Sequence, residues 1–380
     1  MGLKSGPERA ILVGVATRDI ANHVLKEHLD ELGRLADTAG AVVVDCLMQR
    51  RGQLDPSTLV GEGKVREIGE LVKTLEADMV IFDEDLSGSQ IKNLEKHIPV
   101  KILDRSGIIL DIFARHAKTA EAKIQVEVAQ LEYLLPRLTR AWTHLSRQAG
   151  GVGIGMRGPG ETQLEVDRRL IRKRIADLNR KLEKVQSIRQ AQHQHRIPTF
   201  HAALVGYTNA GKSTLMNALT QAGVEAVDKL FATLDPTTRK VWVGTGRTAV
   251  LSDTVGFIRK LPHGLFTSFK STLSVASQAS LILHVVDASS EEFEDQMETT
   301  ARVLNDLEIT EAPRITVFNK IDCLEDERVD FLKSRYPSGV FVSAEKRQGL
   351  ETLRFRMAEQ YDRMRFEQGL ADAALRHPDA

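Results

Sequence analysis

The first hundred residues alternate short apolar runs with amphipathic segments. The apolar runs predict strands at Ala10–Ala16, Ala41–Leu47, Met79–Asp83 and Val100–Leu103. Between them, apolar residues at helical spacing predict helices at Ile20–Ala36, Lys64–Leu75 and Ser89–His97. Apolar strands separated by helices are typical of a small parallel sheet covered by helices. We therefore expect an N-terminal α/β domain over residues 1–110.

Two longer helices follow, each marked by apolar residues at alternating spacings of four and three. The first seam is Ile124, Val128, Leu131, Leu135 and Leu138, and the second is Ile171, Ile175, Leu178, Leu182 and Val185. Such seams are typical of coiled coils, and glycine-rich residues 150–160 connect these two. We expect an antiparallel, coiled-coil-like helical hairpin over residues 111–197. The alternative is an ordinary helical bundle packed on the flanking domains.

The second half of the chain returns to alternating strands and helices after a polar linker at residues 190–198. This pattern continues to about Gln360 and predicts a second α/β domain over residues 198–362, followed by a C-terminal tail over residues 363–380. A chain of 380 residues is too long for one typical domain, which agrees with this division.

Charge is balanced over the whole chain but not along it. Lys and Arg together number 52, as do Asp and Glu, yet residues 111–197 hold 17 basic against 9 acidic side chains. The predicted hairpin is therefore the candidate surface for a polyanion. A charge run on a helix can also be only a solvated face.

The two cysteines carry no disulfide framework. Cys46 and Cys323 are far apart in the chain, each in an apolar setting typical of a buried strand or strand end, so neither a disulfide nor a metal site is expected. Nothing at the N-terminus resembles a signal peptide, and no apolar run approaches membrane-spanning length. We expect a cytoplasmic protein without membrane insertion.

The glycine-rich connection contains a dinucleotide-binding pattern in the wrong context. Gly153, Gly155 and Gly158 have the required spacing, but the polar helical end Trp142–Gln148 precedes them instead of a strand. Residues 61–64, Gly-Glu-Gly-Lys, likewise resemble only half of a phosphate loop. Neither stretch predicts a nucleotide site.

A capping box restarts the helix after the glycine-rich connection. Thr162 with Glu165 three residues later forms it, and the following helix carries Arg168, Arg169, Arg172, Lys173 and Arg174. A loop with little side-chain bulk at the tip of a basic hairpin suits insertion into structured RNA, because phosphates dominate affinity and shape guides recognition.

A phosphate loop lies at residues 206–213. Its members are Gly206, Tyr207, Thr208, Asn209, Ala210, Gly211, Lys212 and Ser213. An apolar run precedes it and an apolar helical pattern follows, which is the strand-loop-helix context that the motif requires. Backbone N–H groups of such a loop surround phosphate oxygens, while Lys212 reaches the outer phosphates and Ser213 the magnesium ion.

Two further segments have the order and spacing of a GTPase. Asp253-Thr254-Val255-Gly256 follows a predicted strand; Asp253 can hold magnesium through water, and the N–H of Gly256 can meet the γ-phosphate. Asn319-Lys320-Ile321-Asp322 follows the predicted strand Ile315–Phe318. A carboxylate at Asp322 accepts from the guanine ring N–H and amine, a pair of donors that adenine does not offer, so GTP is the expected substrate.

Two more stretches complete the predicted nucleotide site. Ser343, Ala344 and Glu345 follow the predicted strand Gly339–Val342 and can supply backbone N–H groups to the guanine carbonyl oxygen. A switch stretch lies between the phosphate loop and Asp253, with Phe231, Ala232, Thr233, Leu234 and Asp235 as its nucleotide-facing candidates. The threonine that binds magnesium and senses the γ-phosphate can be Thr233, Thr237 or Thr238.

The position that commonly orients the attacking water holds an apolar residue. A glutamine often follows the glycine of Asp-x-x-Gly, but here Phe257 and then Ile258 follow Gly256. Neither side chain can position water, so intrinsic hydrolysis should be slow and a partner should accelerate it. A polar group elsewhere in the switches is the alternative.

From about Ala10 to about Gln360 the chain resembles the HflX GTPases. The resemblance is carried by Gly-Tyr-Thr-Asn-Ala-Gly-Lys-Ser-Thr-Leu from Gly206, Leu-Phe-Ala-Thr-Leu-Asp-Pro-Thr-Thr-Arg from Leu230 and Asp-Thr-Val-Gly-Phe-Ile from Asp253. Its most specific part is Gly-x-Gly-Glu-Thr-Gln-Leu-Glu, which ends at Glu165 and which generic GTPases lack. No shared motif is found after Gln360.

The resemblance implies a translation GTPase that binds the large ribosomal subunit and splits stalled or idle ribosomes under stress. It implies that the glycine-rich loop lies near the peptidyl-transferase centre and that the ribosome activates hydrolysis. It also selects Thr233 among the three threonines, with Lys212 and Gly256 as the other catalytic residues and with Ser213, Thr233 and Asp253 as magnesium ligands. The resemblance also implies that some relatives use ATP, with the N-terminal domain as its site, and residues 61–64 leave that open.

We therefore expect a three-part monomeric GTPase of α/β class: a small parallel α/β domain, a helical hairpin and a P-loop GTPase domain. GTP with Mg²⁺ should favour ribosome binding, and hydrolysis should release the protein. One alternative is a GTPase acting on another structured RNA, such as an assembly intermediate. Another is a nucleotide-gated module whose hairpin binds a protein. No DNA partner is expected.

Overall fold

The computed structural model describes residues 6–18, 21–138, 163–194, 200–220, 230–231, 237–260, 276–309 and 312–376. Among these residues the chain forms two compact units, one ending at Val185 and the other beginning at Gln186. The division into three domains stays a prediction. Within the described ranges, no helix combines the length and the apolar character needed to cross a bilayer.

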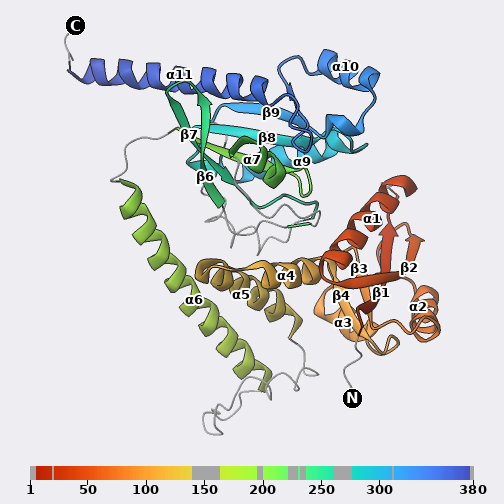
Figure 1. Ribbon diagram of the computed structural model, residues 1–380. Helices are drawn as coiled ribbons and strands as arrows, with labels where there is room; N and C mark the ends of the chain where they lie inside the picture. The colour runs from red at the N-terminus through yellow and green to blue at the C-terminus, as the bar shows by residue number, and fades with distance from the viewer. Residues whose placement is uncertain are drawn as a thin grey trace. The chain divides into compact units, whose positions relative to one another are not determined.

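The first unit contains a four-stranded parallel sheet (Figure 1). Its strands are β1 (Glu8–Ala16), β2 (Ala41–Arg50), β3 (Met79–Phe82) and β4 (Lys101–Asp104), in the order β2-β1-β3-β4. These confirm the four predicted strands. β1 and β3 lie in the middle, and they are continuous apolar runs because helices cover both faces.

Four helices accompany this sheet: α1 (Asn22–Thr38), α2 (Glu62–Thr74), α3 (Gly88–Leu94) and α4 (Arg105–His116). Helices α2 and α3 pack with Ile11, Val13 and Val15 of β1 in one apolar cluster. Helix α1 lies on the opposite face, since its leucines surround Gly14. The α3 helix begins one residue earlier than predicted because Ser87 and Gln90 form a capping box.

Both cysteines are exposed, so the prediction of buried positions is wrong. Cys46 lies on β2, which is one of the two edge strands of its sheet and also exposes Val42, Val43 and Met48. Cys323 lies in the short 3-10 helix η3 (Ile321–Cys323), outside the second sheet. An apolar sequence neighbourhood does not distinguish an edge strand from a central one.

The predicted helical hairpin is present in the first unit. Helix α5 (Ala120–Leu134) and helix α6 (Gln163–Gln194) pack through an apolar cluster made by Ile124, Val128, Leu131, Ile175, Leu178 and Leu182. Arg174 pairs with Glu127, and Arg168 donates to the carbonyl of Leu138. The residue numbers of the contacts rise along one helix as they fall along the other, so the two helices run antiparallel.

The first seam is shorter than predicted. Helix α5 ends at Leu134, and Leu135–Arg137 form the 3-10 helix η1, so Leu135 and Leu138 do not continue the coiled-coil pattern. Pro136 explains this, because proline lacks an N–H and its ring clashes with the preceding helical turn. The glycine-rich residues 150–160 and Thr162 of the predicted capping box lie outside the described residues.

The second unit contains a six-stranded sheet in the order β10-β9-β8-β5-β7-β6. Figure 1 labels β6, β7, β8 and β9 of this sheet. Its strands are β5 (His201–Gly206), β6 (Thr237–Gly244), β7 (Arg247–Asp253), β8 (Leu281–Asp287), β9 (Arg314–Asn319) and β10 (Val340–Phe341). All neighbours are parallel except β6 and β7. Three predicted motifs therefore follow the carboxyl ends of parallel strands at one edge of the sheet, where α/β folds bind ligands.

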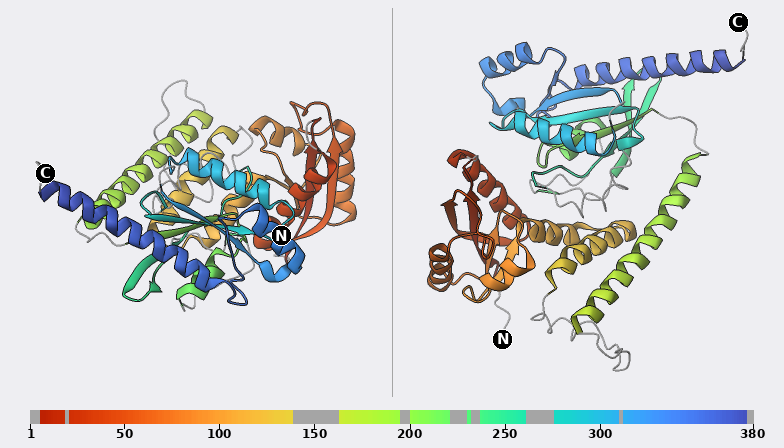
Figure 2. Two further views of the ribbon diagram at one scale, coloured as in Figure 1. Left: turned by 90° about the horizontal axis from the view of Figure 1, so that it is seen from above. Right: turned by 180° about the vertical axis from the view of Figure 1, so that it is seen from behind.

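Among the described residues, the α-helices that lie wholly in this unit are α7 (Lys212–Thr220), α9 (Phe293–Asp306), α10 (Asp326–Arg335) and α11 (Leu350–Arg376). Helix α11 crosses the sheet and extends past it toward the C-terminus (Figure 2). Its Leu353 and Met357 belong to the core, whereas Phe366 further along is exposed.

Candidate functional site

The phosphate loop has a backbone that requires its two motif glycines. Gly206 and Gly211 have φ values of 156° and 85°, a region that side chains disfavour. A Cβ atom at Gly206 would collide with the carbonyl oxygen of Val285, and one at Gly211 with the side-chain amide of Asn319. The loop therefore follows a path that lies directly against β8 and the end of β9.

Lys212 is buried beneath this loop. It begins α7, and its Nζ donates to the carbonyls of Gly206 at 3.2 Å and Tyr207 at 2.8 Å. Burial lowers the pKa of Lys212 to about 8, an effect that the negative charge of Asp253 partly opposes. A cation held at this place suits the charge of nucleotide phosphates.

Ser213 and Asp253 meet beside the lysine. The Oγ of Ser213 donates to Oδ2 of Asp253 at 2.6 Å, and Asp253 is fully buried at the end of β7. Thr254 fixes the next turn by donating its hydroxyl to the carbonyl of Leu204 at 2.7 Å. A hydroxyl and a carboxylate oxygen side by side are the oxygen ligands that Mg²⁺ prefers, so this pair fits the predicted ion.

The segment after Asp253 is bonded to the phosphate loop. The N–H of Thr208 donates to the carbonyl of Phe257 at 2.7 Å, and the N–H of Phe257 donates to Gly206 at 3.0 Å. Gly256 lies so close that a Cβ atom there would be 2.9 Å from Nζ of Lys212. The four predicted residues 253–256 and the loop therefore form one site.

Phe257 and Ile258 turn into the core. Each is only 1% exposed, so neither reaches a water molecule beside the phosphate loop. This agrees with the prediction that these side chains cannot orient an attacking water.

Asn319 has a role that the sequence alone did not reveal. Its Nδ2 donates to the carbonyl of Ala210 at 2.9 Å, and its Oδ1 accepts from the N–H of Ala344 at 3.0 Å. One buried side chain thus joins the phosphate loop to the Ser343–Ala344 turn. Only the tertiary structure brings these three segments together.

The other candidate base-binding residues surround this bridge. Asp322 lies 3.8 Å from Nζ of Lys346, and Nζ of Lys320 pairs with Asp287 at 2.8 Å. The Oγ of Ser343 accepts from the N–H of Lys346 and shapes the turn, which leaves Glu345 exposed. Sequence reasoning missed Asp287, although its place after an apolar strand matches that of Asp253.

The structure describes only part of the switch stretch. Phe231 is buried, with φ of 56°, whereas Ala232, Thr233, Leu234 and Asp235 lie outside the described residues. The other two threonines are in strand β6, where Thr237 pairs with Asp253 and the Thr238 hydroxyl is 2.8 Å from that of Ser252. The choice of Thr233 stays a prediction.

The half motif at residues 61–64 starts an ordinary helix. Gly61 is the N-cap of α2 and donates its N–H to Gln49 at 3.0 Å. Nζ of Lys64 pairs with Glu67 of the same helix at 2.8 Å.

Known proteins resemble this chain over most of its length. The family described as "GTP-binding GTPase N-terminal" matches residues 26–114, "GTP-binding GTPase Middle Region" matches residues 116–196, and "50S ribosome-binding GTPase" matches residues 201–320. GTPase HflX of Caldanaerobacter subterraneus subsp. tengcongensis is 49% identical over 350 residues, which are 91% of this chain and 79% of that protein. GTPase HflX of Escherichia coli K12 is 48% identical over 333 residues, 86% and 77% of the two chains.

A solved structure supports the fold. The crystal structure of SsGBP in complex with GDP is 23% identical in sequence, with a TM-score of 0.54. The match covers 94% of this chain and 99% of that one.

The fold and the site define the class of protein, which is a P-loop GTPase preceded by an α/β sheet and a helical hairpin. At this level of identity over most of both chains, it belongs to the HflX GTPase family. It binds GTP and hydrolyses it.

Proposed function

We propose that this GTPase binds the large ribosomal subunit and uses GTP hydrolysis to split or rescue stalled or idle ribosomes under stress. Residues 1–197 would bind the subunit, with residues 150–160 near the peptidyl-transferase centre, and residues 198–362 would bind GTP. The family description "50S ribosome-binding GTPase" over residues 201–320 supports this partner. The protein would act as a monomer in the cytoplasm.

The observation that carries the proposal is the exposed basic surface of α6. Arg172 and Lys173 are exposed and point away from the apolar seam, and Arg180 and Lys181 continue the basic surface two turns further on. Arg174 is partly neutralised by Glu127, so it contributes less. Arginine and lysine on one helix are suited to RNA phosphates, whose contacts dominate affinity.

The proposed nucleotide roles are those predicted from the sequence motifs. Residues 206–213 would surround the phosphates, with Lys212 on the outer ones, and residues 319–322 with 343–345 would hold guanine through Asp322 and backbone N–H groups. Residues 231–235 and 253–256 would form the switches, in which the N–H of Gly256 senses the γ-phosphate. Ser213, Thr233 and Asp253, the last through water, would hold Mg²⁺, which supplies positive charge to the β- and γ-phosphates.

Nucleotide entry would change the partners of Lys212. Its ammonium now donates to two loop carbonyls, and phosphate oxygens would take over these bonds. Because Phe257 is in the core, the chain itself offers no side chain at that position to orient water. Binding to the ribosome would complete the site and accelerate hydrolysis, after which the loss of γ-phosphate contacts would release the protein.

Gradient sedimentation tests this proposal. The protein loaded with a non-hydrolysable GTP analogue should move with large subunits, and it should do so less at high salt. Replacing Arg172 and Lys173 by Glu should remove it from that fraction. Replacing Arg328 and Lys333 of α10 by Glu, an equal change in net charge, should not.

Other results would point to the alternatives. Binding that survives the α6 change, or that does not depend on salt, would exclude a polyanion contact at this surface. Retention on smaller RNA particles alone would favour an assembly intermediate, and capture of a protein without RNA would favour a nucleotide-gated interaction module.

A further inference from the structure

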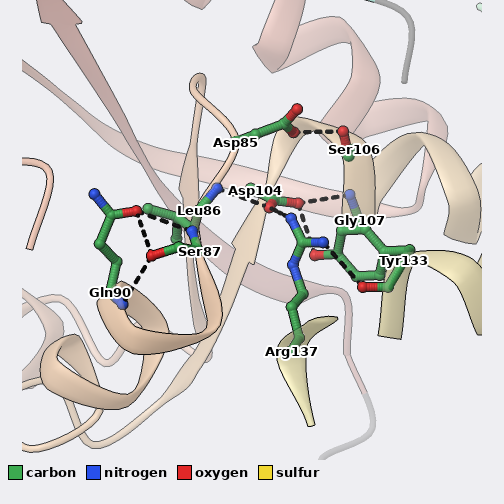
Figure 3. Close-up of polar contacts among 9 residues, drawn as sticks. All are labelled: Asp85, Leu86, Ser87, Gln90, Asp104, Ser106, Gly107, Tyr133 and Arg137. Atoms are coloured by element: carbon green, nitrogen blue, oxygen red, sulfur yellow. Dashed lines mark hydrogen bonds and ion pairs between the residues drawn. The ribbon is translucent and has the colours of Figure 1, made fainter. Parts of the chain in front are cut away.

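A single buried carboxylate joins the N-terminal sheet to the helical hairpin. Asp104, the last residue of β4, is fully buried, and Figure 3 shows its carboxylate bonded to Leu86, Gly107, Tyr133 and Arg137. Its Oδ2 accepts from the N–H of Leu86 at 3.0 Å and from Arg137 at 2.8 Å. Its Oδ1 accepts from the N–H of Gly107 at 2.8 Å and from the Tyr133 hydroxyl at 2.7 Å.

The four donors come from two parts of the first unit. Leu86 precedes α3 and Gly107 lies in the first turn of α4, so these two belong to the sheet side. Tyr133 lies in the last turn of α5 and Arg137 ends η1, so the other two belong to the hairpin side. A buried carboxylate is costly unless it is paired and hydrogen-bonded, and here the hairpin supplies the only cation bonded to it among the described residues.

Tyr133 and Arg137 also hold each other. The guanidinium carbon of Arg137 lies 3.7 Å from the centre of the Tyr133 ring, and its Nη1 donates to the Tyr133 carbonyl at 2.9 Å. Burial, reinforced by the negative charge of Asp104, raises the pKa of Tyr133 far above its usual value. The hydroxyl therefore stays protonated and remains a donor.

Two glycines on the sheet side make room for this contact. A Cβ atom at Gly107 would lie 2.8 Å from the Tyr133 hydroxyl oxygen, and one at Gly88 would lie 3.0 Å from Cα of Arg137. Asp104, Gly88 and Gly107 together form what we call the η1 socket. Residues from two separate segments thus form one binding site for the end of α5 and for η1.

The segment that the socket holds also contacts helix α6. Leu138, directly after η1, is the last described residue before α6, and its carbonyl accepts from Arg168 of α6 at 3.3 Å. Residues 133–138, the segment that is bonded to the sheet, therefore include the end of α5 and contact the first turns of α6. The glycine-rich residues 150–160 lie between these two points in the sequence.

We propose that the η1 socket positions the hairpin for RNA, and that Tyr133 and Arg137 are positioning residues for large-subunit binding. This inference rests on the proposed function. Misplacing a bound group by about 1 Å is enough to weaken an interaction that depends on its orientation. A socket that only stabilised the fold would have no such effect on affinity in folded protein.

Three variants of the full chain test the socket. Tyr133→Phe removes one hydroxyl, Arg137→Met removes the cation, and Gly107→Ala places a methyl group against Tyr133 while improving the helix propensity of α4. Arg115→Met is the matched control, because Arg115 also links two elements of this unit, donating to the Ala39 carbonyl and pairing with Asp111, but lies outside the socket.

The measured quantities are the affinity for large subunits in the GTP-analogue state, the thermal midpoint, and amide hydrogen exchange over residues 133–138. Arg137→Met should weaken affinity about tenfold, because it removes the charged partner of Asp104 and both guanidinium hydrogen bonds that hold the segment, and amide exchange over residues 133–138 should be faster. Gly107→Ala and Tyr133→Phe should also weaken the affinity of the folded protein, since the first displaces the Tyr133 hydroxyl from Asp104 and the second removes it. A fourth variant, Arg137→Lys, should restore part of the Arg137→Met loss. The Arg115 control should bind like the wild type.

Two negative results are distinguishable. If the wild-type chain does not bind large subunits, the proposed function is wrong and this inference fails with it. If the wild type binds and the variants bind equally well although residues 133–138 exchange faster, only the socket inference is overturned.

Discussion

The side-chain amide of Asn319 donates to the carbonyl of Ala210 at 2.9 Å, so the residue that ends β9 holds the phosphate loop in place. The same side chain accepts from Ala344, which ties the loop to the Ser343–Ala344 turn. The phosphate loop and the Ser343–Ala344 turn therefore share one side chain, so losing this side chain should affect both.

Asn319→Ala should weaken GDP binding and lower the stability of the GTPase unit together. Removing Asn319 leaves two buried backbone groups without their partner, at a cost of about 1–3 kcal/mol each. Calorimetric titration and thermal unfolding measure the two effects. Asn305→Ala, at an exposed site on α9, is the control, and an Asn319 variant that binds GDP like this control would contradict the bridging role.

Asp322→Asn should reduce the preference for guanine. In the proposed site the carboxylate would accept from the ring N–H and from the amine of guanine. The amide of asparagine can accept through its oxygen but presents a donor in place of the second oxygen, so GDP affinity should fall by about a hundredfold or more. Xanthosine diphosphate, which carries an oxygen in place of the amine, should lose less. Competition binding with both nucleotides measures this, with Asp330→Asn on α10 as an exposed control; an unchanged guanine preference would show that the base assignment is wrong.

Nucleotide affinity should fall as the pH rises through about 8. Burial lowers the pKa of Lys212 to about 8 in the nucleotide-free protein, and phosphate oxygens would raise it again on binding. Above pH 8 binding must therefore take up a proton, and GDP affinity should decrease by up to about tenfold per pH unit.

Calorimetry in two buffers of different ionisation enthalpy measures this proton uptake directly. Without nucleotide, the free energy of unfolding should instead increase as the pH rises from about 8 toward 10.5. Over this range the folded protein has already lost the unfavourable buried charge of Lys212, whereas the unfolded chain still binds the proton. A GDP affinity that is constant from about pH 7 to about pH 9 would contradict the assignment of Lys212 to the phosphates.

Local patterns were enough to predict the four strands of the first sheet and to locate the nucleotide motifs. Gly206, Lys212 and Asp253 each belong to a short motif whose residue spacing is set by a single loop or strand end. The structure brings these motifs together, as the sequence predicts. Asp104 gave no such signal, because its partners Tyr133 and Arg137 come from a different element and only packing unites them. The exposure of Cys46 likewise depends on strand order, which periodicity does not contain.

Replacing Phe257 by glutamine should not give fast intrinsic hydrolysis. A reading of the motif alone suggests that Phe257→Gln would supply the missing water-orienting group. Phe257 is almost fully buried, however, and its backbone is bonded on both sides to the phosphate loop. A polar side chain there would lose the packing of the ring and bury an amide without partners, so the free energy of unfolding should fall by about 3–5 kcal/mol.

Thermal unfolding and intrinsic GTP turnover, measured together, decide this prediction. Trp242→Gln is the matched control, because Trp242 is an exposed aromatic residue on β6 of the same unit and its loss should change neither quantity much. A stable Phe257→Gln protein with faster intrinsic turnover would mean that residue 257 can leave the core and reach the nucleotide. Since the buried ring is the reason that this chain offers no side chain there, such a result would also remove the need for a partner to complete the site.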